Sequence, residues 1–155
     1  MAQAVDARGM DQLMSAWDRL LQRFPQEKQL LLRQVGDTIL EQVRLRIGGT
    51  GKVAGWQEPH MGSKGGYVAV RPASDVFQMT QSGTRYPVGY ITNAIEGGHR
   101  ISEPRGGKGY RPRIHVPAVS GRWFYDAVRR QLPGIAEEAA RQLANLICDG
   151  LEGML

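Results

Sequence analysis

Histidines are the residues of this 155-residue chain that could serve most readily as bases or metal ligands. The three are His60, His99 and His115, and no two of them lie three to five positions apart. The single cysteine, Cys148, is far from all of them in the sequence. Zinc sites usually contain at least one closely spaced pair of ligands. The spacing therefore predicts no metal site, and the apolar helical position of Cys148 predicts a buried, unreactive thiol.

Glu96 and His99 flank two glycines and could act as an acid–base pair. An acid and a histidine beside glycines are, however, more often surface or helix-capping residues. No Ser-His-Asp or Cys-His order accompanies them. We therefore expect no catalytic residue, no cofactor and no enzyme activity, and we keep a small hydrolase only as a third alternative, with no positive support.

The segment GGTGKVAG (Gly48–Gly55) invites comparison with a phosphate-binding loop. Such a loop needs a glycine, four residues and then Gly-Lys-Ser/Thr, following a strand. Here Val53 follows Lys52, Arg46 occupies the position of the first glycine, and the preceding pattern is helical. The segment therefore reads as a flexible basic loop.

Positive charge is concentrated in the glycine-rich middle of the chain. Residues 48–122 contain 15 of the 20 glycines, ten Lys/Arg and four acids, a net charge of +6, whereas the rest of the chain carries −1. Aromatic residues, among them Trp56 and Tyr67, are interspersed with these bases. The pattern suits phosphate contacts with base stacking, or docking on an acidic protein, and the sequence leaves both open. The candidate interface or DNA-facing residues are Lys52, Lys64, Arg100, Arg105, Lys108, Arg111 and Arg113.

Apolar periodicity places helices on both sides of this middle segment. Leu13, Trp17, Leu20 and Phe24 form one stripe, with Asp11 as the expected N-cap, and a second stripe runs from Leu31 to Ile47. Pro25 either breaks this region or starts a second helix. Near the C-terminus, Phe124, Val128 and Leu132 form a third stripe. We expect Ser120 to cap this helix at its N-terminus and Pro133-Gly134 to kink or split it. We expect the stripe from Leu13 to Phe24 and the stripe from Phe124 to Leu132 to form the core, with Trp17 buried.

The intervening residues predict an α+β fold with an antiparallel sheet of about four strands packed against the two helical regions. Strands are expected at Tyr67–Arg71, Val76–Thr80 and Pro112–Pro117, whereas Val88–Glu96 fits a strand or a short helix. The length predicts one domain over residues 1–155, with 1–9 flexible and with extended loops at 48–66 and 98–111. No leader or apolar membrane-spanning run is visible, so we expect a soluble protein made in the cytoplasm, with no membrane partner.

The order of these parts resembles the tail-component family of tailed bacteriophages, which are small neck or tail-completion proteins at the head–tail junction. The resemblance covers about Met10 to Leu146 and rests on short motifs: a GGY strand, a "Tyr … Val/Ile-Glu-x-Gly" segment and a proline-led aromatic entry into the last helix. The matching residues are Tyr90, Glu96, Gly97, Gly98, His99, Pro117, Trp123 and Phe124. The insertion between Glu103 and Tyr110 and the six-residue gap from Pro117 to Trp123 depart from the family pattern.

The resemblance implies a non-enzymatic structural protein of the virion that forms a homo-oligomeric ring in the neck or tail and is made in the host cytoplasm. It implies as partners a head-completion or connector protein and a tail-terminator or tail-tube protein, with nonspecific contact to packaged DNA. The alternative that the basic composition leaves open is a stand-alone, sequence-nonspecific nucleic-acid-binding protein.

Overall fold

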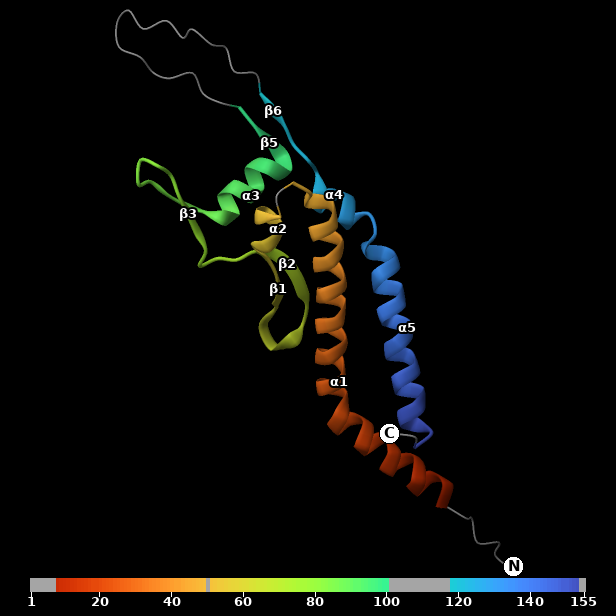
Figure 1. The fold of residues 1–155 in the computed structure, drawn as a ribbon. Helices are drawn as coiled ribbons and strands as arrows, with labels where there is room; N and C mark the ends of the chain where they lie inside the picture. The colour runs from red at the N-terminus through yellow and green to blue at the C-terminus, as the bar shows by residue number, and fades with distance from the viewer. Residues whose placement is uncertain (1–7, 50, 101–117, 154–155) are drawn as a thin grey trace, which may run out of the picture. The chain divides into compact units, whose positions relative to one another are not determined.

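The computed structural model describes residues 8–49, 51–100 and 118–153, in which helices and short strands are mixed (Figure 1). The predicted α+β class is confirmed. The elements in chain order are α1 (Arg8–Ile47), α2 (Lys52–Gly55), β1 (Gln57–Met61), the 3-10 helix η1 (Ser63–Gly65), β2 (Val68–Pro72), β3 (Phe77–Met79), β4 (Arg85–Pro87), α3 (Val88–Gly97), β5 (Gly98–His99), β6 (Val119–Ser120), α4 (Phe124–Arg129) and α5 (Leu132–Leu151).

The strands form three separate two-stranded sheets, β1–β2, β3–β4 and β5–β6, so the prediction of one sheet of about four strands is wrong. Strands β3 and β4 pair antiparallel with Gln78 opposite Tyr86, and β5 and β6 pair antiparallel with Gly98 opposite Ser120. Each strand has only two to five residues. A two-stranded sheet of that length depends on packing against other elements.

The chain, predicted as one domain, divides into two compact units. The first contains Met1–Thr38, Pro59–Ala69 and Gln131–Leu155. The second contains Ile39–Glu58 and Val70–Arg130. Each unit is described separately below.

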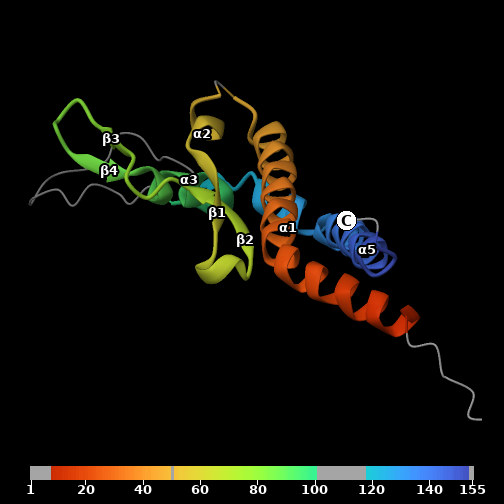
Figure 2. The same ribbon diagram turned by 90° about the horizontal axis from the view of Figure 1, so that it is seen from below.

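Helix α1 continues through Pro25, although we expected this residue to break a helix or to start one. The helix changes direction between its N-terminal part, red in Figure 2, and the orange part that follows. A proline inside a helix removes one hydrogen bond and produces such a bend. Asp11 lies in the first turn and is therefore not the N-cap that we predicted. The helix ends at Ile47, as predicted, because Gly48 adopts a φ of 61°.

In the first unit, α5 lies beside the N-terminal part of α1, and Ala16 and Leu20 are buried there. Trp17 is 47% exposed, so its prediction as a core residue is wrong. The reason is that the apolar stripe of α1 is wider than the surface that α5 covers. Cys148 of α5 is also exposed, which corrects the prediction of a buried thiol.

The second unit has a core of four buried side chains that come from two distant parts of the chain: Val43, Ile47, Phe124 and Val128. Ile39, Val53, Ala54, Val70, Ile95 and Tyr125 pack around it. Phe124 and Val128 were predicted as core residues, and both are confirmed. Leu132, the third member of that stripe, lies in the first unit and is exposed.

Residues 48–66, predicted as a long loop, contain α2, β1 and η1. The sequence of β1, Gln57–Met61, does not alternate in polarity. Pairing with β2 therefore stabilises this segment as a strand, although its local sequence does not predict one. Val88–Glu96, which fitted either state, is helical in α3. Residues 98–100 include β5, whereas the rest of the expected loop over 98–111 and the expected strand Pro112–Pro117 lie outside the described residues.

The C-terminal helical region is split into α4 and α5 near Pro133-Gly134, as predicted, and Pro133 lies in the first turn of α5. Ser120, the predicted cap, instead pairs with Gly98 in the β5–β6 sheet, and the residue before α4 is Trp123. Ion pairs four residues apart lie on both helices: Asp126 contacts Arg130 at 2.7 Å and Glu137 contacts Arg141 at 3.3 Å.

Candidate functional site

Glu96, for which the sequence favoured a surface or capping role over an acid–base pair with His99, caps a helix. One carboxylate oxygen accepts the backbone N–H of Tyr125 and the other accepts that of Asp126, each at 3.1 Å. These two residues lie in the first turn of α4, whose N–H groups have no partner within the helix. A negative charge at this end is also favoured by the helix dipole. The ring nitrogen Nδ1 of His99 lies 3.4 Å from the backbone oxygen of Ala94. Both carboxylate oxygens of Glu96 are thus bonded to α4, and the recorded contact of His99 is with a different group.

Glycines bring the two chain segments of this corner into close contact. Gly98 has a φ of 78°, and a Cβ there would lie 2.5 Å from the backbone oxygen of Val119. A Cβ on Gly121 would overlap the backbone oxygen of Glu96. The backbone N–H of Arg122 and of Trp123 then donates to Ile95 and Glu96, at 2.9 and 3.1 Å. Only residues without a side chain permit this approach.

A shallow hollow of about 460 Å³ opens at the same corner, and His99, Arg100 and Trp123 supply side chains to its wall. Trp123 is exposed and has a φ of 53°, a conformation that residues with a Cβ rarely adopt. The structure thus brings together six of the eight motif residues, namely Glu96, Gly97, Gly98, His99, Trp123 and Phe124. Tyr90 is exposed on α3, and Pro117 lies outside the described residues.

A buried polar network occupies the interior of the second unit. The Tyr125 hydroxyl donates to Oε1 of Gln57, whose Nε2 donates to the backbone oxygen of Val53 at 3.0 Å and to Oγ1 of Thr92 at 3.4 Å. The Thr92 hydroxyl donates in turn to Val88 at 2.8 Å. Gln57 and Thr92 are almost completely buried. Burial, with a contribution from the nearby Glu96 charge, raises the pKa of Tyr125 above its ordinary value, so the phenol stays protonated at neutral pH.

Two arginines tie α1 to its surroundings within this unit. Arg44 donates from Nη2 to the backbone oxygen of Gln57 at 3.1 Å and from Nε to that of Ala54 at 3.2 Å. Arg122 donates to the backbone oxygen of Ile47, the last residue of α1, at 3.1 Å. Helix C-termini carry unpaired carbonyls that cations satisfy well. Sequence reasoning missed Gln57, Thr92, Arg44 and Arg122, because nothing in their local pattern distinguishes them from surface polar residues.

The predicted basic residues do not form one described cluster. Lys52 lies in the second unit with its Nζ 5.9 Å from the centre of the Trp56 ring, a cation–π geometry. Lys64 lies in η1 of the first unit with a φ of 57°, and Arg100 lines the hollow beside His99. The four remaining residues, Arg105, Lys108, Arg111 and Arg113, lie outside the described residues, as do the aromatic and glycine residues around them.

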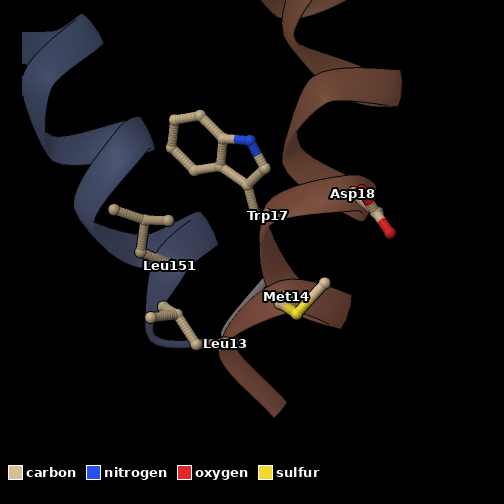
Figure 3. A pocket seen from close by; sticks show the side chains of 5 residues that line it. All are labelled: Leu13, Met14, Trp17, Asp18 and Leu151. Atoms are coloured by element: carbon tan, nitrogen blue, oxygen red, sulfur yellow. The ribbon is translucent and has the colours of Figure 1, made fainter. Parts of the chain in front are cut away.

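A second hollow lies in the first unit, and four of its five lining residues are apolar (Figure 3). We call it the α1 hollow; its lining residues are Leu13, Met14, Trp17, Asp18 and Leu151, and its volume is about 370 Å³. Figure 3 shows Leu13 and Trp17 of α1 on the side of Leu151 of α5. Exposed apolar residues extend from the hollow along α1, with Met10 and Met14 each 60% exposed and Leu21 54% exposed.

Within residues 8–49, 51–100 and 118–153, no group of three or more His, Cys, Asp or Glu residues gathers to hold a metal ion. None of the helices described there has the length and hydropathy that a membrane crossing requires. No protein-family model, curated protein or solved structure matches this chain.

Proposed function

We propose that this chain is a structural protein of a tailed-phage virion that forms a homo-oligomeric ring at the head–tail junction and joins head to tail. The observation that carries the proposal is the apolar surface of α1 around the α1 hollow. Trp17, Met14 and Leu21 are large apolar residues on consecutive turns, and each is about half or more exposed. Contiguous exposed apolar surface of this kind usually marks a protein–protein interface.

The use of the polar residues supports a structural role. Glu96, the strongest candidate for a general acid or base, is hydrogen-bonded to the first turn of α4. Gln57, Thr92 and Tyr125 satisfy one another inside the second unit. Side chains that are hydrogen-bonded in this way stabilise the fold of the subunit. The resemblance to phage neck and tail-completion proteins suggests the place of action, and six of its eight motif residues lie where the end of α3 meets the start of α4.

The partners that we propose are further copies of the chain, a head-completion or connector protein on one side, and a tail-terminator or tail-tube protein on the other. The net charge of +6 in residues 48–122 suits weak, sequence-independent contact with packaged DNA or docking on an acidic neighbour. The protein would then reside in the neck or tail of the virion.

A genetic test separates this role from the alternatives. Deleting the gene from the encoding phage should give DNA-filled heads and complete but unattached tails, and a plasmid copy should restore joined particles. Replacing Arg105, Lys108, Arg111 and Arg113 with Ser in that copy should leave the subunit folded but reduce joining, because we propose that these charges act in contacts with neighbouring proteins or DNA. Normal joined particles without the gene would overturn the proposal.

A further inference from the structure

The β3–β4 hairpin (Figure 2) lies in the second unit, and its residues Met79 and Arg85 are exposed. Opposite residues of an antiparallel pair share a face, and side chains alternate along each strand. The register Phe77–Pro87 and Met79–Arg85 therefore places these four residues on one face, which we call the hairpin face. Tyr86 belongs to the other face, where its ring stacks on Tyr90 of α3 with centroids 6.1 Å apart.

The composition of the hairpin face is that of an interface centre. Met79 is 65% exposed, and the Arg85 guanidinium lies 3.7 Å above the centre of the Phe77 ring. Aromatic residues, methionine and arginine are the types enriched where protein surfaces meet. A hairpin with three-residue strands also gains little stability by itself and benefits from a partner.

The hairpin face and the α1 hollow complement each other in charge and in form. Arg85 is the one charged residue from Phe77 to Pro87, and Asp18 is the one charged residue among the five that line the hollow. The hollow, at about 370 Å³, lies at the lower end of pockets that hold small ligands, about 300–1,000 Å³, so it suits a few side chains of a partner. A projecting hairpin with an exposed methionine supplies such side chains.

We infer that the hairpin face of one copy docks in the α1 hollow of a second copy, with Met79 against Trp17 and Arg85 beside Asp18. The inference rests on the proposed function, since it names the contact through which the ring subunits meet. The two surfaces differ, so each copy has one donor surface and one acceptor surface. A contact between unlike surfaces repeats from copy to copy and closes into a ring when the rotation permits.

Charge exchange between two purified variants tests the inference. Asp18→Arg alone and Arg85→Asp alone should each weaken self-association about tenfold or more, measured as the apparent Kd by sedimentation velocity, because each places like charges in the contact. An equimolar mixture of the two variants should restore association. When the two variants alternate, the unchanged Arg85 of Asp18→Arg meets the unchanged Asp18 of Arg85→Asp. At the next contact the two substituted positions meet, and they again carry opposite charges.

Matched controls make the result specific. Asp37→Arg changes an exposed acid of the same helix and should leave association unchanged, alone or mixed with Arg85→Asp. Tyr86→Ser alters the opposite face of the hairpin and should also have little effect. Circular dichroism of each variant should match that of the wild type, and Met79→Ser provides a second, uncharged test if either charge variant fails to fold.

The outcomes distinguish the inference from the proposed function. A wild-type oligomer that neither single variant weakens overturns the docking contact and leaves the ring in place. Single variants that weaken association without recovery in the mixture also overturn the contact. A wild-type protein that stays monomeric at all concentrations overturns both the contact and the proposed ring.

Discussion

The carboxylate of Glu96 accepts the backbone N–H of Tyr125 at 3.1 Å, so the end of α3 caps the start of α4 across 29 positions of the chain. We expect Glu96→Ala to lower the free energy of unfolding by about 0.5–2 kcal/mol, the range for loss of a capping side chain. Urea unfolding followed by circular dichroism measures it. Glu138→Ala, which removes an exposed acid of α5, should change stability by less than about 0.5 kcal/mol. Equal effects of the two substitutions would contradict the capping role.

Tyr125 should make stability depend on pH in the alkaline range. Burial and the Glu96 charge raise the pKa of Tyr125 in the folded protein, so the unfolded chain releases this proton first as the pH rises above about 10. The folded state then holds more protons than the unfolded state, and stability falls with rising pH. The contribution is complete below pH 10. Tyr125→Phe should flatten the decline between pH 10 and 11, whatever its effect at pH 7. The free energy of unfolding, measured by urea titration at several pH values, gives this slope. The same slope in Tyr125→Phe and in the wild type would show that folding does not change the pKa of Tyr125.

Gly36 should not tolerate a methyl group. A Cβ at this position in α1 would lie 2.6 Å from Cγ2 of Val68, too close for contact without displacement of β2. Gly36→Ala should therefore destabilise the protein by about 1–3 kcal/mol, although alanine is the better helix former. Gly134→Ala is the matched control in α5, because a Cβ there meets no atom within 4 Å. This control should be neutral or stabilising by up to about 1 kcal/mol, and similar thermal shifts in both variants would be evidence against the close packing of β2 on α1.

Leu20 and Trp17 should respond differently to truncation, although both belong to the apolar stripe of α1. Leu20 is 3% exposed, so Leu20→Ala should cost about 2–5 kcal/mol of stability. Trp17→Ala should cost less than the 3–5 kcal/mol typical of a buried aromatic residue, and it should weaken self-association. Thermal unfolding at low protein concentration and sedimentation at high concentration separate the two effects. A larger loss of stability from Trp17→Ala would place Trp17 in the core after all.

Local sequence signals were sufficient where one residue determines the backbone. Gly48 ended α1, Pro133 marked the split between α4 and α5, and alternation over Tyr67–Arg71 identified the strand that became β2. The same signals failed where distant contacts decide. Gln57 begins a strand that has no apolar alternation, and β5 pairs with β6, about twenty residues later, with Gly98 opposite Ser120. For Trp17, periodicity predicted the apolar stripe correctly and could not tell how much of it another helix covers.

The candidate site was predictable in kind and not in detail. A capping role for Glu96 followed from its glycine neighbours, but its partner helix did not, because α4 comes 28 residues later. The polar network of Gln57, Thr92 and Tyr125 has no sequence signature. The sequence does not predict that Met79 and Arg85 share a face, because this depends on the register of the hairpin.

Native mass spectrometry of the purified chain, with negative-stain imaging of the same sample, tests the central claim of a ring-forming structural subunit most directly. We predict one discrete closed oligomer at micromolar concentration, ring-shaped in the images, with little change between 50 and 200 mM salt because apolar contacts hold it together. A monomer that binds short DNA duplexes, with an affinity that falls steeply over the same salt range, would contradict the claim and favour a stand-alone nucleic-acid-binding protein.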